Sequence, residues 1–184
     1  SGGKFMIIGE RIYLRAFEPD DYRLINKWRN DPEINKYLGG NTFLVSSERE
    51  KKSIENKIFD DTKDIYFAIC DIQSKKLIGY SSINNIDYRN LKAEWGGTLI
   101  GEKEFLGKGF GKESAALMLR FLFDQYPINK CYAYCLEEHP ITKKLFSSLG
   151  FKQDGILRKD IFKNGEFKNL LLFSILREEI NGYF

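Results

Sequence analysis

Short stretches of this chain alternate hydrophobic and polar residues, which is typical of β-strands with one buried face. Other stretches repeat hydrophobic residues three and four positions apart, which predicts helices. In chain order the patterns predict a strand, two helices, three strands, a helix, a strand, a helix and two final strands. The expected strands are residues 11–16, 65–71, 77–84, 93–100, 131–136, 156–162 and 167–176, and the expected helices are residues 18–29, 46–59, 139–149 and the segment that follows the glycines at 107–111.

Turn-forming residues separate these elements and support their order. The pair Asn164-Gly165 predicts a tight hairpin between the last two strands, and Gly150 is a typical helix stop. The pair Gly96-Gly97 lies inside an expected strand, where adjacent glycines mark a bulge or the close approach of another backbone or a ligand. The order predicts a mixed α/β sheet of about seven strands with about four helices.

The most informative segment precedes the third expected helix. Gly107, Gly109 and Gly111 alternate with Lys108 and Phe110, and a helical pattern follows at once. Alternating glycines expose successive backbone N–H groups without a Cβ in the way. The start of the helix adds unpaired N–H groups and the positive end of its dipole. The segment therefore predicts a site for a phosphate or pyrophosphate. The alternative is a loop that only turns into a buried helix.

Two known phosphate loops do not match this segment. A P-loop requires glycine where Leu106 stands, and Ser or Thr where Glu113 stands. A dinucleotide-binding fingerprint requires G-x-G-x-x-G near the first strand, whereas this chain has G-x-G-x-G late in its sequence. Neither a nucleoside-triphosphate loop nor a dinucleotide fingerprint is therefore expected.

Length and charge narrow the class of protein further. We expect one domain over residues 1–184, with Ser1-Gly2-Gly3 as a remnant of tag cleavage. The net charge is only +3 and the Lys and Arg residues are scattered, so no nucleic-acid partner is expected. No segment is long enough to span a membrane and no signal-peptide pattern opens the chain, so we expect a cytoplasmic protein without a membrane partner.

The cysteines do not indicate a metal site. Cys70, Cys131 and Cys135 form no C-x-x-C motif and have no histidine at metal-ligand spacing. Their odd number also argues against a disulfide scaffold. We therefore expect buried free thiols and no metal.

The order of elements and several sequence segments together resemble the GNAT superfamily of acetyl-CoA-dependent N-acetyltransferases. The family's loop has the form Q/R-x-x-G-x-G/A, which is matched by Gly109-Phe110-Gly111, with Leu106 in place of the usual first residue. The segments GERIYLRAFEPDD, WRNDPEI, AEWGG, IGEKEFLGKGFGKE and GFKQDGILRKDIFKNGEF are similar to the RimJ/RimL-type branch. The resemblance covers residues 9–176. It implies a GNAT-like, mostly antiparallel sheet that splays apart between its fourth and fifth strands.

The resemblance gives the expected anion an identity, the pyrophosphate of coenzyme A. The implied contacts are the backbone N–H groups of Leu106, Gly107, Lys108, Gly109, Phe110, Gly111 and Lys112. The pantetheine arm would run between the strands at 93–100 and 131–136, and Gly96-Gly97 would allow the distortion. Backbone groups of Leu99 and Ile100 would then pair with the pantetheine amides.

Transfer of acetyl from a thioester to an amine requires a neutral amine and a donor for the developing oxyanion. A thiol with a pKa of about 8.5 leaves adequately without an acid. The RimJ/RimL-type pattern often has a glutamate at the position of Glu94, which lies beside the expected distortion. Glu94 is therefore the candidate that receives the proton of the amine, directly or through one water. The alternative is a surface carboxylate at a strand edge.

A second group of candidates lies on the helix expected at 139–149. His139, Thr142 and Phe146 share one face of it, while Ile141 is expected on the core face. In the family these three positions usually read N-x-x-S-x-x-x-Y, where the Asn and Ser contact the cofactor and the Tyr protonates the sulfur. Cofactor contacts are therefore implied for all three residues, yet Phe146 cannot donate a proton.

Three explanations for Phe146 remain open. The thiolate leaves unassisted or with the help of water; another group donates to the sulfur, with Thr142 nearest by periodicity; or the protein binds the cofactor without turnover. His139 is the only histidine, and we expect a helix cap or a cofactor contact rather than an acid–base role.

The acceptor is expected to be a small-molecule or peptide amine. Protein N-termini, amino sugars (nucleotide-linked ones included), polyamines and aminoglycoside-like drugs all remain open. Trp28 and Arg29 lie where family members build the acceptor pocket, with plain helix packing by Trp28 as the alternative. A cationic acceptor would favour the carboxylates of Glu33, Glu48 and Glu94, whereas a nucleotide-linked one would favour Lys27, Arg29 and Lys36.

The expected activity is an acetyl-CoA-dependent N-acetyltransferase in which a primary amine attacks the thioester directly. The alternative, supported by Phe146, is a module that senses acetyl-CoA and has lost catalysis. A monomer and a homodimer are both compatible with the sequence.

Overall fold

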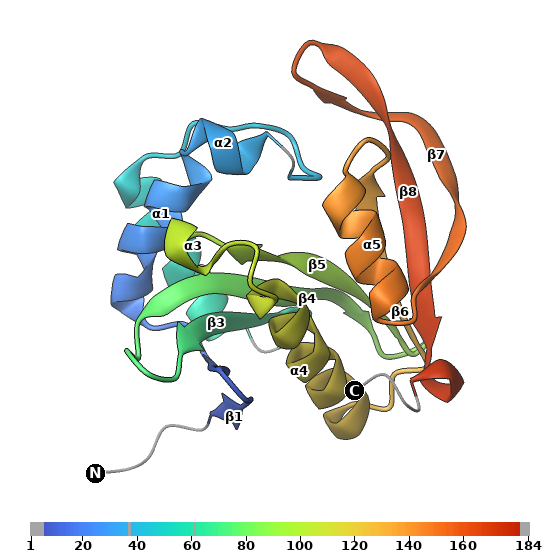
Figure 1. The fold of residues 1–184 in the computed structure, drawn as a ribbon, viewed down its shortest axis with the longest axis horizontal. Helices are drawn as coiled ribbons and strands as arrows, with labels where there is room; N and C mark the ends of the chain where they lie inside the picture. Colours follow the sequence, from blue (N-terminus) through green and yellow to red (C-terminus); the bar gives the residue numbers. More distant parts are fainter. Residues whose placement is uncertain (1–5, 37, 61, 181–184) are drawn as a thin grey trace.

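The computed structural model of the protein describes residues 6–36, 38–60 and 62–180 (Figure 1). Residues 1–3, expected to be a tag remnant, lie outside the described residues. The strands are β1 Ile7–Ile8, β2 Ile12–Arg15, β3 Ile65–Asp71, β4 Leu77–Asp87, β5 Lys92–Ile100, β6 Lys130–Leu136, β7 Lys152–Lys163 and β8 Glu166–Leu176. The helices are α1 Tyr22–Arg29, α2 Pro32–Asn35, α3 Ser47–Phe59, α4 Phe110–Gln125 and α5 Pro140–Ser148.

The eight strands form one sheet in the order β1-β2-β3-β4-β5-β6-β8-β7. Neighbouring strands pair antiparallel, except β5 and β6, which are parallel and are connected through α4. A parallel pair needs such a crossover because its connection must return to the starting edge. The mixed, mostly antiparallel sheet expected from the sequence is confirmed. In Figure 1 the β7–β8 ribbon extends beyond the rest of the sheet.

Two clusters of buried side chains hold the helices on opposite faces of the sheet. Phe67 and Ile69 of β3 belong to the cluster that contains α4 and α5, while Ala68 and Cys70 belong to the one that contains α1 and α3. Successive residues of a strand point to opposite faces. The pair α4 and α5 therefore packs on one face, and α1 and α3 pack on the other.

The sheet opens between β5 and β6. Only residues 92–94 of β5 pair with β6, and the last pair joins Glu94 to Tyr132. Between Ser81 and Ile83 of β4 the register against β5 shifts, and the opposing Gly97 has a φ of 92°. This bulge bends β5 away from its neighbour. The expected separation of these strands, and the distortion at Gly96-Gly97, are therefore confirmed.

The described residues contain eight strands and five helices, one of each more than expected. Strand β1 has two residues, too few for the hydrophobic alternation that identifies a strand. Helix α2 is a single turn in which the side chain of Asp31 caps the N–H of Glu33. The Asp31-Pro32 pair that ends α1 thus also begins α2, because proline suits the first turn of a helix.

Candidate functional site

The glycine loop lies at the N-terminus of α4. Gly107 and Gly109 have φ angles of 70° and 83°, and Gly109 is the residue that caps the helix. Such angles are readily adopted only by glycine. The first N–H groups of the helix, at Phe110, Gly111 and Lys112, have no partner within the helix. The loop therefore presents backbone donors at the positive end of α4, as an anion site requires.

Arg11 holds this loop in place. Its guanidinium donates to the carbonyl of Lys108 at 2.7 Å and to the carboxylate of Glu113 at 2.9 Å, and it lies 4.3 Å from the ring centre of Phe110. Glu113 also accepts the backbone N–H groups of Glu10 and Arg11. This clamp was missed from the sequence because its partners are 97 or more residues apart.

The open edge of β5 begins directly after Glu94. Leu99 pairs with Tyr80 and Ile100 with Gly79 on the β4 side, whereas the β6 side is unpaired at these positions among the described residues. Backbone N–H and C=O groups on that side are available to an extended ligand. The arrangement fits a pantetheine arm between β5 and β6, as the sequence predicted for Ile100.

Glu94 occupies the point at which the two strands separate. Its half-buried carboxylate accepts a hydrogen bond from the side chain of Asn85 at 2.9 Å. Burial raises the pKa of Glu94 and the charge of Asp64 adds to this, while the hydrogen bond from Asn85 opposes it. A carboxylate with a raised pKa is a stronger base. The position and the environment therefore suit acceptance of a proton from an amine.

Hydrogen bonds connect Glu94 across the sheet to β3. Asp64 accepts the backbone N–H of Asn85 at 2.8 Å and the hydroxyl of Tyr66 at 3.1 Å. Burial, followed by the charge of Asp64 and this hydrogen bond, raises the pKa of Tyr66 to about 12. Tyr66 therefore stays protonated at neutral pH and donates to Asp64. The row from Glu94 to Tyr66 spans three neighbouring strands.

His139 caps helix α5. Its Nδ1 accepts the backbone N–H of Thr142 at 3.2 Å, as expected of a cap. Burial lowers the pKa of His139, which favours the neutral ring that such an acceptor requires. Ile141, expected on the core face, is instead 72% exposed. Ile141 lies in the first turn of α5, whereas the contacts of this helix with the core begin further along, at Leu145.

Phe146 lies inside an aromatic cluster. Its ring centre is 4.9 Å from that of Phe173 and 5.3 Å from those of Trp95 and Phe151. The side chain is 2% exposed. The ring therefore fills the core beneath β5 and β6, on the α4 and α5 side of the sheet, and contributes no donor there.

Trp28 and Arg29 were expected to bind the acceptor. Trp28 is 1% exposed, stacks on Tyr80 and donates to Glu102 at 3.3 Å. A Cβ on Gly101 would lie 2.1 Å from its ring, so that glycine is required for the packing. Arg29 donates to the buried carboxylate of Glu50 at 3.2 Å. The structure thus places Trp28 in the core and Arg29 in an ion pair beneath α3.

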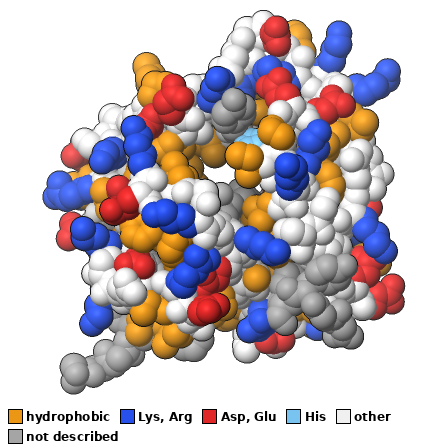
Figure 2. Space-filling view, viewed as in Figure 1, with side chains coloured by type: hydrophobic (Ala, Val, Ile, Leu, Met, Phe, Trp, Pro, Cys, Tyr) orange, Lys and Arg blue, Asp and Glu red, His pale blue; other side chains and the backbone are white. Residues whose placement is uncertain are grey.

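The loop between α2 and α3 and the β7–β8 hairpin form two walls that a bridge of hydrogen bonds joins. Lys163, at the end of β7, donates to the carbonyls of Leu38 and Gly40, and Asn41 donates to the carbonyl of Phe162 at 2.9 Å. The loop between α2 and α3 is thus tied to the β7–β8 hairpin. Figure 2 shows the surface hollowed at its centre, between these walls.

Other kinds of chemistry find little support in the described residues. They contain no group of three or more His, Cys, Asp or Glu side chains that could hold a metal ion. The three cysteines are buried and unpaired, and burial raises the pKa of Cys135 to about 11. No helix in residues 6–36, 38–60 and 62–180 is long and apolar enough to cross a membrane.

Comparison with known proteins agrees with this geometry. Residues 11–152 match the family model of the acetyltransferase (GNAT) domain. The chain is 29% identical over 174 residues to the uncharacterized N-acetyltransferase p20 of Bacillus licheniformis, covering 94% of this chain and 97% of that protein. It is 28% identical to the spermidine N(1)-acetyltransferase of Vibrio cholerae, covering 94% and 96%.

Solved structures show the same fold. The crystal structure of the Vibrio cholerae spermidine N-acetyltransferase in complex with CoA and spermine superposes with a TM-score of 0.85 at 27% identity. The match covers 94% of this chain and 99% of that one. The family model covers well over half of this chain. The chain therefore belongs to the GNAT acetyltransferases and is an acetyl-CoA-dependent acyltransferase.

Proposed function

We propose that this protein transfers acetyl from acetyl-CoA to the primary amine of a small molecule, with Glu94 as the general base. The observation that carries the proposal is the position of Glu94 at the last residue pair before β5 and β6 separate. Its half-buried carboxylate and raised pKa suit removal of a proton from an amine. Direct attack of the amine needs no covalent enzyme intermediate.

The coenzyme contacts in this proposal follow from the backbone. Residues 107–112 present N–H groups to the pyrophosphate, with Gly109 shaping the loop and Arg11 holding it. Leu106, also expected to contribute, instead donates its N–H to the carbonyl of Lys103. Ile100 offers backbone groups on the free edge of β5 to the pantetheine amides. The backbone groups of Leu99 point to β4 instead, because Gly101, two residues further on, donates to Ile78 of β4. His139 and Thr142, at the start of α5, complete the predicted contacts, and Phe146 contributes through packing.

The leaving thiolate needs no acid in this proposal. Its conjugate thiol has a pKa of about 8.5, so it leaves at a useful rate unassisted or with water. The hydroxyl of Thr142 is a further candidate donor, since Thr142 lies in the first turn of α5. Phe146 is the only feature that supports the alternative of a non-catalytic sensor. Turnover on any amine would exclude that alternative.

The acceptor belongs to the small primary amines. Relatives named spermidine acetyltransferases show that this fold accepts polyamines. One relative, 24% identical, is named putative ribosomal N-acetyltransferase YdaF of Bacillus subtilis, which supports the RimJ/RimL-type branch less than the spermidine acetyltransferases support a polyamine acceptor. The carboxylates of Asp64 and Glu94 are linked through Asn85, and this negative charge would favour a cationic amine near Glu94 before its proton is removed.

The proposal is tested by following thiol release from acetyl-CoA with a panel of primary amines. Glu94→Gln should lower kcat by about 10²–10⁴-fold and remove the acidic limb of the pH–rate profile. Binding of coenzyme A, measured by calorimetry, should be unchanged. Asp124→Asn, an exposed carboxylate of α4, serves as the matched control. An unchanged pH–rate profile in Glu94→Gln would exclude the base assignment, and tight coenzyme binding without turnover on any amine would favour the sensor.

A further inference from the structure

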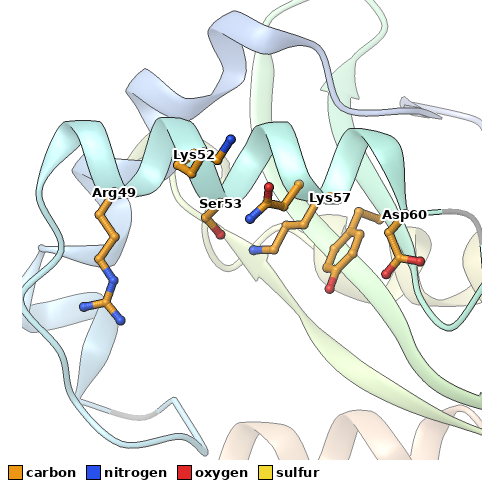
Figure 3. Close-up of a pocket in the computed structure, with 7 residues that line it drawn as sticks. Arg49, Lys52, Ser53, Lys57 and Asp60 are labelled. Atoms are coloured by element: carbon orange, nitrogen blue, oxygen red, sulfur yellow. The ribbon is translucent and has the colours of Figure 1, made fainter.

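A basic cavity lies beside α3, outside the residues assigned above to coenzyme binding. It has a volume of about 380 Å³, and its charged lining comes from Arg49, Lys52, Lys57 and Asp60, with Tyr66 of β3 as one wall. Figure 3 shows Arg49, Lys57 and Asp60 projecting from one side of α3. The lining thus contains three cationic side chains and one carboxylate.

A single carboxylate does not balance three cations, and one of its oxygens already accepts a hydrogen bond at the end of α3. Asp60 ends α3, and its Oδ1 accepts the backbone N–H of Thr62 at 3.1 Å. Lys52 makes an exposed pair with Glu55 at 3.5 Å, which contributes little in water. Among the described residues, no carboxylate lies within 4.0 Å of Arg49 or Lys57. The cavity therefore has a surplus of positive charge.

Lys57 is the most constrained of the three cations. Its ammonium lies 5.1 Å from the ring centre of Tyr66. Burial lowers the pKa of Lys57, and the charge of Arg29 lowers it further, against the opposing charges of Glu50 and Asp64. A half-buried ammonium that lacks a close counter-ion is stabilised when an anion binds beside it.

The cavity is connected to the proposed catalytic base. Tyr66 donates to Asp64, Asp64 accepts from Asn85, and Asn85 donates to Glu94. Two strand spacings separate β3 from β5, which corresponds to about 10 Å. Tyr66 and Glu94 are also offset by two residues along β4, so an acceptor that reaches from Glu94 to the cavity must be extended and more than about 10 Å long.

We propose that this cavity binds an anionic group, a carboxylate or a phosphate, of the same acceptor whose amine lies at Glu94. The proposal rests on the proposed function and narrows its acceptor class to amines that carry an anion at the far end. A polycation is disfavoured, because its second ammonium would meet Arg49, Lys52 and Lys57. In this respect the chain differs from an enzyme selective for spermidine.

Matched pairs of amines test this proposal. Hexane-1,6-diamine and 6-aminohexanoate have similar lengths but opposite charges at the far end, while glucosamine and glucosamine 6-phosphate differ by one phosphate. We expect higher kcat/KM for the anionic member of at least one pair. A preference confined to the first pair indicates a carboxylate, and one confined to the second indicates a phosphate.

Substitutions in the cavity supply the second arm. Lys57→Gln and Arg49→Gln should raise KM for the preferred anionic acceptor by about tenfold or more, the effect expected of a lost charge-assisted contact. The KM values for acetyl-CoA and for glucosamine should stay unchanged. Lys51→Gln, on the same helix but outside the cavity lining, is the control. Lys57→Glu should shift the preference towards the diamine.

Binding supplies a readout that does not depend on turnover. Isothermal titration with 6-aminohexanoate and with glucosamine 6-phosphate, in the presence of coenzyme A, should show binding that Lys57→Gln weakens. The inference is overturned if the wild-type protein binds neither anion, or if the diamine is preferred and the cavity variants leave selectivity unchanged. If the protein prefers the anionic acceptors as expected but Glu94→Gln leaves activity unchanged, only the assignment of Glu94 as the base is refuted.

Discussion

At the scale of single residues, two neighbouring glycines of the coenzyme loop have different roles. Gly109 has a φ of 83°, and a Cβ there would lie 3.3 Å from the guanidinium of Arg11. Gly111 has space for a Cβ and no positive φ. The alternation of glycines in the sequence makes the two positions look equivalent, and only the backbone conformation distinguishes them.

This difference leads to a prediction about coenzyme affinity. Gly109→Ala forces a non-glycine residue into the left-handed region, at a cost of about 1–2 kcal/mol, and pushes against Arg11. We expect coenzyme A to bind about tenfold more weakly in a calorimetric titration. Gly111→Ala is the matched control and should bind with nearly wild-type affinity. Equal losses of affinity in the two variants would contradict this prediction, because they would show that the loop depends on Gly109 and Gly111 to the same extent.

At the scale of an element, the start of α5 depends on the protonation of one side chain. The neutral ring of His139 accepts the N–H of Thr142, whereas a ring protonated at Nδ1 donates and cannot cap. The folded state lowers the pKa of His139. The stabilisation is therefore present above the unfolded pKa of about 6.5 and is lost as the pH falls through the lower folded value.

The pH dependence of this cap can be measured by difference. His139→Ala should reduce the free energy of unfolding by about 1 kcal/mol at pH 7.5, the typical contribution of an N-cap. The difference between the two proteins should shrink at pH 5, where the cap is being lost from the wild type. His139→Asn, which retains an acceptor, should stay close to the wild type at both pH values. A deficit in His139→Ala that is independent of pH would contradict this.

The elements themselves were largely predictable. Period-two alternation identified the long strands, and Gly150 and Asn164-Gly165 indicated the turns, because these signals are local. Ile141 was misassigned because periodicity cannot show how far along a helix its packing begins. The two-residue β1 is defined by its pairing with β2. Ile7 pairs with Leu14, and Ile8 pairs with Tyr13.

At the scale of the whole molecule, contacts between distant segments join the loop between α2 and α3 to the β7–β8 hairpin, beside the space proposed for the acceptor. Lys163 is 3% exposed and ties the hairpin to the carbonyls of Leu38 and Gly40. A buried ammonium needs such partners, since burial without them is costly. The bridge ties the loop between α2 and α3 to the end of β7.

Removal of this bridge should loosen the acceptor space without affecting the coenzyme site. In Lys163→Met we expect faster hydrogen exchange in residues 38–46 and a KM for the amine raised about threefold to tenfold, the range of one lost hydrogen bond. The KM for acetyl-CoA should not change. Lys159→Met, an exposed lysine of the same strand, is the control. Unchanged exchange in the loop would show that the bridge does not order it.

By itself the sequence determined the order of elements, the glycine loop at the start of a helix and the place of Glu94 beside the strand distortion, because local spacing and backbone chemistry specify them. The tertiary structure decided what distant residues do together. It brought Arg11 to the loop, buried Trp28 and Phe146 in the core, and connected the cavity at Lys57 to Glu94 through Asp64 and Asn85. These contacts join segments that no local pattern relates, so only the packing of the folded chain could establish them.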